Sequence, residues 1–187
     1  SITETLFMTS RDGLTFHRWS EAFVRPGPRR DRWIYANTMP GYGLLVTRPE
    51  ISGMPEELSL YVKDGGGWTS GGTASRFRRY ALRVDGFVSV QAPLVGGEIV
   101  TRPITFTGHH LTVNLSTSAA GSVRAEIQDA RGRPIDGFRL DDCPEIFGDS
   151  LDKVIHWRQG PDVSQLAGRP VRLRFVVKDA DLYSFQF

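Results

Sequence analysis

The sequence predicts an all-β protein, and two observations support that prediction. Short apolar runs alternate with turn-forming residues about every ten positions along the 187 residues, which is typical of β-sandwiches and barrels. No segment shows the apolar period of an amphipathic helix of three turns. We therefore expect an antiparallel β-sandwich over residues 85–187, preceded by a more irregular β-rich segment over residues 1–84.

The β-rich segment 1–84 begins with a predicted hairpin. Residues 5–10 and 15–19 are strand-like runs on either side of Asp12-Gly13, a dipeptide that favours tight turns. Because this strand pattern begins at residue 2, we expect its pairing partners to lie upstream in a longer parent protein, or its exposed edges to pair with another copy of the chain. Further strands are predicted at residues 43–47, 57–62 and 76–84.

Two more hairpins are predicted in the sandwich segment. Residues 171–177 alternate apolar and polar side chains up to a turn at 179–181, after which Tyr183, Phe185 and Phe187 share a face. Residues 111–116 and 123–128 alternate in the same way around a turn at 118–121. Each hairpin has one apolar face, so each has to close against another sheet.

Composition narrows the classes of partner. Of the 23 basic residues 20 are arginines, scattered among strands in a chain of net charge +2, which argues against a nucleic-acid groove. We interpret the cluster Arg76-Arg78-Arg79 as a solvated sheet face, although arginine also clamps carboxylates and stacks on sugars. No apolar run approaches the roughly 20 residues that cross a bilayer. We expect a soluble chain without a membrane partner, located in the cytoplasm or secreted after removal of a signal peptide.

No cofactor or metal is expected. Cys143 is the single cysteine, and a lone cysteine is more often a small buried apolar residue than a nucleophile. The four histidines have no metal-ligand spacing. Two acidic loops offer oxygens for a structural calcium, but their spacing is not that of an EF-hand, and we interpret them as polar turns. Their acids are Asp141, Asp142, Asp149 and Asp152 in one loop, and Asp179 and Asp181 in the other.

Glycoside hydrolysis needs two carboxyl groups about 5 to 10 Å apart. Asp12 is better interpreted as a turn residue before Gly13, and Glu56-Glu57 as a solvated strand edge. Enzymatic activity of the chain by itself therefore stays open. The candidate acids of the first segment are Asp12, Asp31, Glu50, Glu56, Glu57 and Asp64.

Loop-borne aromatic residues suggest a saccharide site. Sugar rings pack their C–H faces on aromatic rings, and their hydroxyls need amide or carboxylate partners. The alternative is that these rings fill gaps between sheets, as large aromatic side chains commonly do. The candidate saccharide-binding residues are Trp33, Tyr35, Asn37, Tyr42 and Trp68.

Several stretches resemble the C-terminal part of bacterial five-bladed-propeller glycoside hydrolases, the invertase- and levanase-like group. They are residues 80–89, 127–129, 137–138, 168–175 and 181–187, and the stretch 10–16 also resembles a strand-turn-strand of a propeller blade. The resemblance implies a β-sandwich over 85–187 behind the last blade or two of a propeller over 1–84. A complete propeller needs about 20 strands, which 84 residues cannot supply.

The chain departs from that family at its catalytic motifs. The Asp-Pro nucleophile motif and the Glu-Cys acid motif are both missing, and Asp142-Cys143 echoes the latter only superficially. We therefore expect an accessory, carbohydrate-binding part of a glycoside-hydrolase-like protein, whose partners are carbohydrate and an upstream propeller. The alternatives are a complete small glycosidase that uses acids within residues 12–64, and a purely structural sandwich or oligomerisation module.

Overall fold

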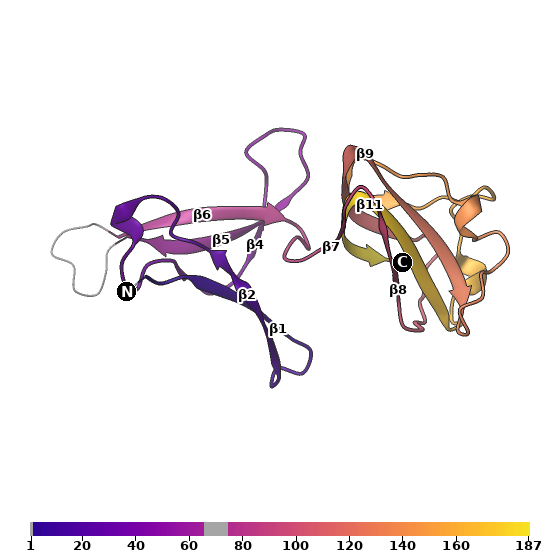
Figure 1. The fold of residues 1–187 in the computed structure, drawn as a ribbon, viewed down its shortest axis with the longest axis horizontal. Helices are drawn as coiled ribbons and strands as arrows, with labels where there is room; N and C mark the ends of the chain where they lie inside the picture. The colour runs from indigo at the N-terminus through magenta and orange to yellow at the C-terminus, as the bar shows by residue number, and fades with distance from the viewer. Residues whose placement is uncertain (1, 66–74) are drawn as a thin grey trace. The chain divides into compact units, whose positions relative to one another are not determined.

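The structure is a computed structural model that describes residues 2–65 and 75–187. It is all-β with antiparallel pairing throughout the described sheets, as the sequence predicts. The chain divides into two compact units, Ser1–Val84 and Asp85–Phe187, drawn from indigo to magenta and from magenta to yellow in Figure 1. Among the described residues, no helix has the length and apolarity needed to cross a membrane.

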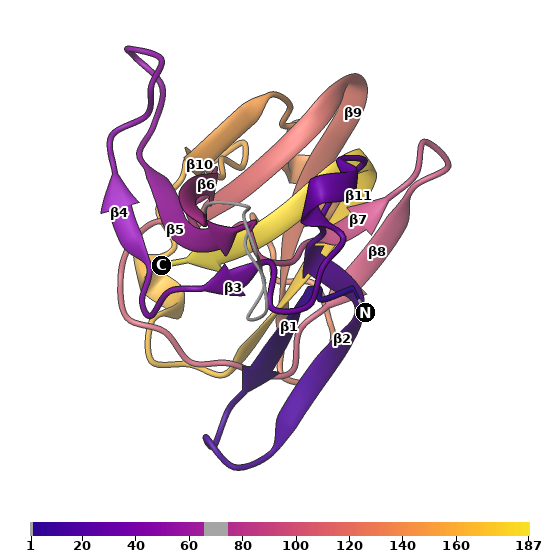
Figure 2. The ribbon, with the colours of Figure 1, turned by 90° about the vertical axis from the view of Figure 1, so that its left-hand side faces the viewer.

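The first unit begins with the predicted hairpin, which is confirmed. Strands β1 (Thr5–Ser10) and β2 (Phe16–Val24) pair antiparallel and run side by side to a tip at residues 11–15 (Figure 2). Gly13 has φ +75° at this tip, a conformation that glycine adopts without strain. Within this hairpin, the ring of Phe7 packs on the rings of Trp19 and Phe23.

A four-stranded sheet completes the first unit. Strand β5 (Glu57–Asp64) pairs with β6 (Arg76–Arg83) along one edge and with β3 (Met39–Pro40) and β4 (Leu45–Thr47) along the other. Alternate side chains of β5 face a small core in which Leu60 and Val62 pack with Val24 of β2. The 3₁₀ turn η1 (Arg30–Arg32) lies in the connection between β2 and β3.

The second unit is built on one five-stranded sheet. The long strands β9 (Thr112–Asp129) and β11 (Val171–Gln186) pair along almost their whole length, as Figure 1 shows. Strand β10 (Asp149–Val154) flanks β9, while β7 (Val90–Ala92) and β8 (Gly97–Val100) pair with successive parts of β11. The 3₁₀ turns η2 (Leu140–Asp142) and η3 (Ser164–Leu166) lie in the loops before β10 and β11.

The two hairpins predicted in the second unit are wrong. Residues 111–116 do not fold back on 123–128, and 171–177 do not fold back on 183–187, because each pair of segments belongs to one continuous strand. The two continuous strands pair with each other instead: Leu173 lies opposite Ile127, and Leu182 opposite Leu115. Long-range pairing has replaced two local turns.

The predicted turn residues form a bulge in this ladder. Lys178 lies opposite Ser122 and Ala180 opposite Thr117, so residues 118–121 of β9 face the single residue Asp179. Gly121 is needed here, because a Cβ atom on it would lie 2.8 Å from the Lys178 carbonyl oxygen and still closer to that of Asp179. A bulge bends and twists its strand, and side chains from both halves of β9 and β11 meet in one core.

Candidate functional site

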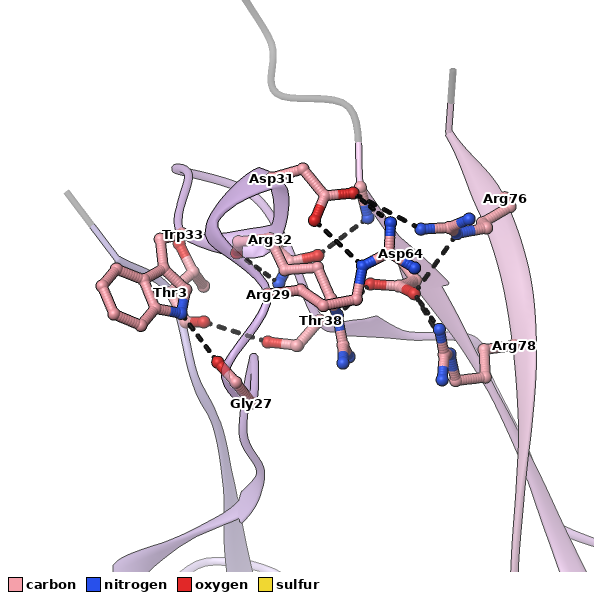
Figure 3. A network of polar contacts seen from close by, with 12 residues as sticks. Thr3, Gly27, Arg29, Asp31, Arg32, Trp33, Thr38, Asp64, Arg76 and Arg78 are labelled. Carbon is pink, nitrogen blue, oxygen red and sulfur yellow. Dashed lines mark hydrogen bonds and ion pairs between the residues drawn. The ribbon is translucent and has the colours of Figure 1, made fainter. Parts of the chain in front are cut away.

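The predicted saccharide-binding aromatics of the first unit lie at its surface. Trp33, the residue after η1, is 49% exposed and Tyr35 is 65% exposed, while Tyr42 in the β3–β4 connection is fully exposed. The indole Nε1 of Trp33 donates a hydrogen bond to the Gly27 carbonyl oxygen at 2.7 Å, which orients the ring (Figure 3). Trp68 lies outside the described residues.

Asn37 is buried in the loop that carries Trp33 and Tyr35. It is 0% exposed, its Nδ2 donates to the Arg32 carbonyl oxygen at 2.7 Å, and its Oδ1 accepts from the Gly65 amide at 2.9 Å. Both ends of the amide are therefore used inside the protein. Asn37 supports the loop from within, whereas the sequence had suggested a direct contact with sugar.

The same loop is tied to the start of the chain. The Thr3 hydroxyl accepts the Ala36 amide proton at 3.0 Å, and the Thr38 hydroxyl donates to the Thr3 carbonyl oxygen at 3.1 Å. Ala36 and Thr38 have φ of 61° and 53°, and side-chain-bearing residues adopt this region at an energetic cost that the surroundings must offset. These hydrogen bonds fix the backbone of the loop, and the loop carries the aromatic rings.

A network of arginines and carboxylates adjoins this loop (Figure 3). Asp64 at the end of β5 accepts from Arg32 Nε at 2.6 Å and lies 2.9 Å from Arg78 Nη2. Asp31 receives two hydrogen bonds from Arg29, at 2.6 and 3.1 Å. Arg76 lies between the two carboxylates, 3.5 Å from Asp64 and 3.7 Å from Asp31. Arg76 and Arg78 of β6 thus contact carboxylates, whereas the sequence pattern alone indicates a solvated face.

This network keeps both carboxyl groups ionised. Burial by itself raises the pKa of Asp64, but the hydrogen bond from Arg32 and the charges of Arg32 and Arg78 outweigh it, so the pKa is lowered. The pKa of Asp31 is lowered chiefly by its hydrogen bonds from Arg29. Burial likewise opposes the charge of Arg32, yet hydrogen bonds to Tyr80 and Asp64 raise its pKa. A general acid in glycoside hydrolysis requires a raised pKa, which neither aspartate has.

Asp12 lies in a hollow at the hairpin tip, lined by Thr9, Ser10, Arg11, Asp12, Thr15, Phe16 and His17. Its Oδ1 accepts from the amides of Leu14 and Thr15 and from the Ser10 hydroxyl. These hydrogen bonds, the one from Thr15 first, lower its pKa. Asp12 is the one carboxyl group among the described residues of this lining, so the hollow lacks the second acid that hydrolysis needs.

Glu50 and Glu57 meet at Arg79 on the opposite face of β6 from Arg76 and Arg78. Glu57 Oε1 contacts Arg79 Nη2, and Glu50 Oε1 lies 3.7 Å from Arg79 Nη1. Arg79 Nε also donates to the Ser59 hydroxyl at 2.7 Å. Glu56, the remaining candidate acid, is exposed and directly precedes β5. The acids therefore fall into separate groups.

The acids that were predicted to lie in two polar turns lie mostly in strands: Asp149 and Asp152 belong to β10 and Asp179 and Asp181 to β11, whereas Asp141 and Asp142 belong to η2. Asp141 and Asp142 lie 3.4 and 3.8 Å from Arg124 and Arg158, and Asp181 accepts from the Ser89 hydroxyl at 2.6 Å. Within residues 2–65 and 75–187, no three His, Cys, Asp or Glu side chains form a metal-binding group. Cys143 is buried, and burial raises the pKa of its thiol, which disfavours the reactive thiolate.

Comparison with protein families, with curated proteins and with solved structures finds no match to this chain. Sequence reasoning missed Arg29 and Arg32, which hold Asp31 and Asp64. Arg29 and Asp31 are only two residues apart, so their ion pair could have been predicted from the local sequence. Arg32 and Asp64 are 32 residues apart, and their ion pair could not.

Proposed function

We propose that this chain binds carbohydrate as an accessory part of a glycoside-hydrolase-like protein of the invertase- and levanase-like group. The proposed contacts are the rings of Trp33, Tyr35 and Tyr42. The observation that supports this best is the combination of exposed rings with a backbone held from within by Asn37. A preorganised surface loses less conformational entropy when a ligand binds, and exposed aromatic faces suit the C–H faces of sugars.

The arrangement of the acids favours binding over catalysis. Asp64 is buried under three arginines, Asp31 is held by Arg29, and Asp12 is occupied by the hairpin turn. The one observation that favours a complete glycosidase is the meeting of Glu50 and Glu57 at Arg79. Reducing-sugar release from a panel of oligosaccharides distinguishes the two functions, because release requires a catalytic pair and binding does not.

The test of the binding proposal is Trp33→Ala. A panel of oligo- and polysaccharides is first screened for a rise in the Tm of the purified chain. For a saccharide that raises the Tm, we expect Trp33→Ala to reduce affinity about tenfold, since truncating an aromatic contact removes much of its binding energy. The Tm without ligand is expected to change little, because this ring is half exposed. Calorimetric titration measures the affinity.

Phe77→Ala is the matched control for Trp33→Ala. Phe77 is an aromatic residue of the same unit that is 77% exposed and is not among the proposed contacts. It is expected to leave the affinity unchanged. A Trp33→Ala chain that melts several degrees lower and binds as tightly as the wild type would instead assign the ring to a structural role.

A further inference from the structure

The network around Asp31 and Asp64 has more positive than negative charge. Among the described residues, the four guanidinium groups of Arg29, Arg32, Arg76 and Arg78 lie within salt-bridge distance of two carboxylates, which leaves two positive charges in excess. Residues 66–74, which connect β5 to β6, contain no acidic side chain that could balance them. Like charges held together at a partly exposed surface attract an anion.

The four arginines are not equally engaged by the carboxylates. Arg32 is buried at 8% side-chain exposure, and Arg78 is 41% exposed but only 2.9 Å from Asp64. Arg76 is 47% exposed, and its contacts of 3.5 and 3.7 Å are longer than the about 2.7–2.9 Å of a charge-assisted hydrogen bond. Both of its acidic neighbours have closer partners. Arg76 is therefore the guanidinium best able to turn toward a ligand.

We propose that Arg76, with Arg29 and Arg78 beside it, binds the acidic group of an anionic saccharide. This inference rests on the proposed carbohydrate function and specifies its ligand class. A guanidinium matches planar carboxylates and tetrahedral sulfate esters through paired N–H donors, so the acidic group is a uronate carboxylate or a sugar sulfate. Trp33 directly follows η1, whose Asp31 and Arg32 belong to the network (Figure 3). The proposed ligand is an oligosaccharide long enough to contact the Trp33 ring at one end and Arg76 at the other.

The test compares a charged sugar with its uncharged form. Trigalacturonate and its trimethyl ester share the same rings and differ in the three negative charges. We expect the wild-type chain to bind the acid at least tenfold more tightly than the ester in calorimetric titrations. A sulfated carrageenan tetrasaccharide is the second charged ligand. If trigalacturonate binds more tightly, the acidic group is a uronate carboxylate, and if the carrageenan binds more tightly, it is a sulfate.

Variants test whether Arg76 is responsible for the preference for the charged ligand. Arg76→Gln is expected to weaken binding of the acid about tenfold and leave the ester unaffected, because it removes a contact that only the charged ligand makes. The Arg76→Gln variant keeps the ion pairs of Arg32 and Arg78 with Asp64, so we expect it to fold as the wild type does. An unchanged Tm without ligand would verify this. Arg76→Lys is expected to restore part of the affinity, since lysine keeps the charge without the planar fork. Arg48→Gln removes an exposed positive charge of the same unit outside the network and is expected to change neither affinity.

The outcomes separate this inference from the proposed function. Equal binding of acid and ester, both dependent on Trp33, overturns the anionic specificity and leaves carbohydrate binding intact. Equal losses in Arg76→Gln and Arg48→Gln also overturn it, because they show a general effect of net charge. If none of the three saccharides binds, and the wider panel does not bind either, carbohydrate binding itself is rejected.

Discussion

Asp64 is a single buried side chain that joins several segments of the first unit. Its carboxylate is 0% exposed and contacts Arg32 from η1 and Arg76 and Arg78 from β6, so one side chain connects three segments of the chain. A buried ion pair gives little net stability compared with an apolar replacement, but the loss of one partner leaves an uncompensated charge. The polar contacts of Asp64 therefore specify how η1, β5 and β6 meet.

The lowered pKa of Asp64 predicts a loss of stability in acid. A carboxyl group whose pKa is lower in the folded state stabilises the fold at pH values above its unfolded-state pKa of about 4. That contribution decreases as the pH falls below about 4 and is gone below the folded-state pKa. Asp64→Asn is expected to lower the free energy of unfolding of the first unit by about 3–5 kcal/mol at pH 7. Urea unfolding, followed by tryptophan fluorescence from pH 7 to pH 2.5, measures both effects.

The difference between wild type and Asp64→Asn isolates this one carboxyl group. Other aspartates with lowered pKa contribute to acid sensitivity in both chains, and their effects cancel in the comparison. The difference should shrink as the pH falls below about 4, and a constant difference down to pH 2.5 would contradict the assignment. These other aspartates are Asp12, Asp31, Asp129 and Asp162.

At the scale of elements, the bulge between β9 and β11 decides the architecture of the second unit. Four residues of β9 face Asp179, which has φ 42°. In β11 the buried positions are odd-numbered from Val171 to Val177 and even-numbered at Ala180 and Leu182. The bulge thus changes which positions of β11 face the core, and it lets one strand serve both halves of the sheet.

Gly121→Ala tests this bulge. A Cβ atom at position 121 would approach the carbonyl oxygens of Lys178 and Asp179 too closely for either backbone to relieve it, so we expect a loss of about 1–3 kcal/mol in the stability of the second unit. Gly97→Ala in β8 is the matched control, because its Cβ atom would lie an ordinary 3.6 Å from Ala92. Its effect should stay within about 1 kcal/mol. Thermal and urea unfolding compare the two variants, and equal effects would count against a steric role for Gly121.

The β1–β2 hairpin could be predicted from the sequence, whereas the bulge between β9 and β11 could not. The hairpin of β1 and β2 could be predicted because Asp12-Gly13 and the flanking runs are local signals. Ser118–Gly121 and residues 179–181 also contain turn-forming residues at a break in the apolar alternation, and a bulge and a turn produce the same break. Only the partner strand, about 60 positions away in the sequence, distinguishes them.

The candidate site was predictable to a similar extent. Exposed aromatics on a loop could be proposed from the residues of the loop itself, and Trp33 and Tyr35 do lie at the surface. The burial of Asn37 could not be proposed, because it depends on the Gly65 amide, which comes from the end of β5. The partners of Arg76 and Arg78 were hidden for the same reason, since β6 meets η1 and β5 only in the folded unit.

At the scale of the whole molecule, the two units differ in how much core supports them. In the described part of the first unit the buried apolar cluster is Val24, Leu60 and Val62. The second unit packs both long strands and its loops into one continuous core that includes Trp157 and Phe138. Because apolar burial is the dominant favourable contribution to folding, the second unit is expected to be the more stable of the two.

Unfolding of the chain should therefore occur in two transitions. We expect the first unit to unfold at a lower urea concentration, reported by its exposed Trp19 and Trp33, and the second unit later, reported by the buried Trp157. A chain comprising residues 85–187 should reproduce the later midpoint. A single transition with coincident fluorescence and circular dichroism changes would show that the two units unfold as one.

The position of β11 determines when the second unit can form during synthesis. This strand pairs with β7, β8 and β9, yet it is the last of them to leave the ribosome. Until its residues emerge, the nascent chain holds residues 90–129 without the central strand of their sheet, and contacts of such sequence separation form slowly. The strands of the first unit all come from residues 5–83 and need not wait. Of these two units, the one with the smaller core can thus fold first, and the one with the larger core depends on a strand that is made after β7, β8 and β9.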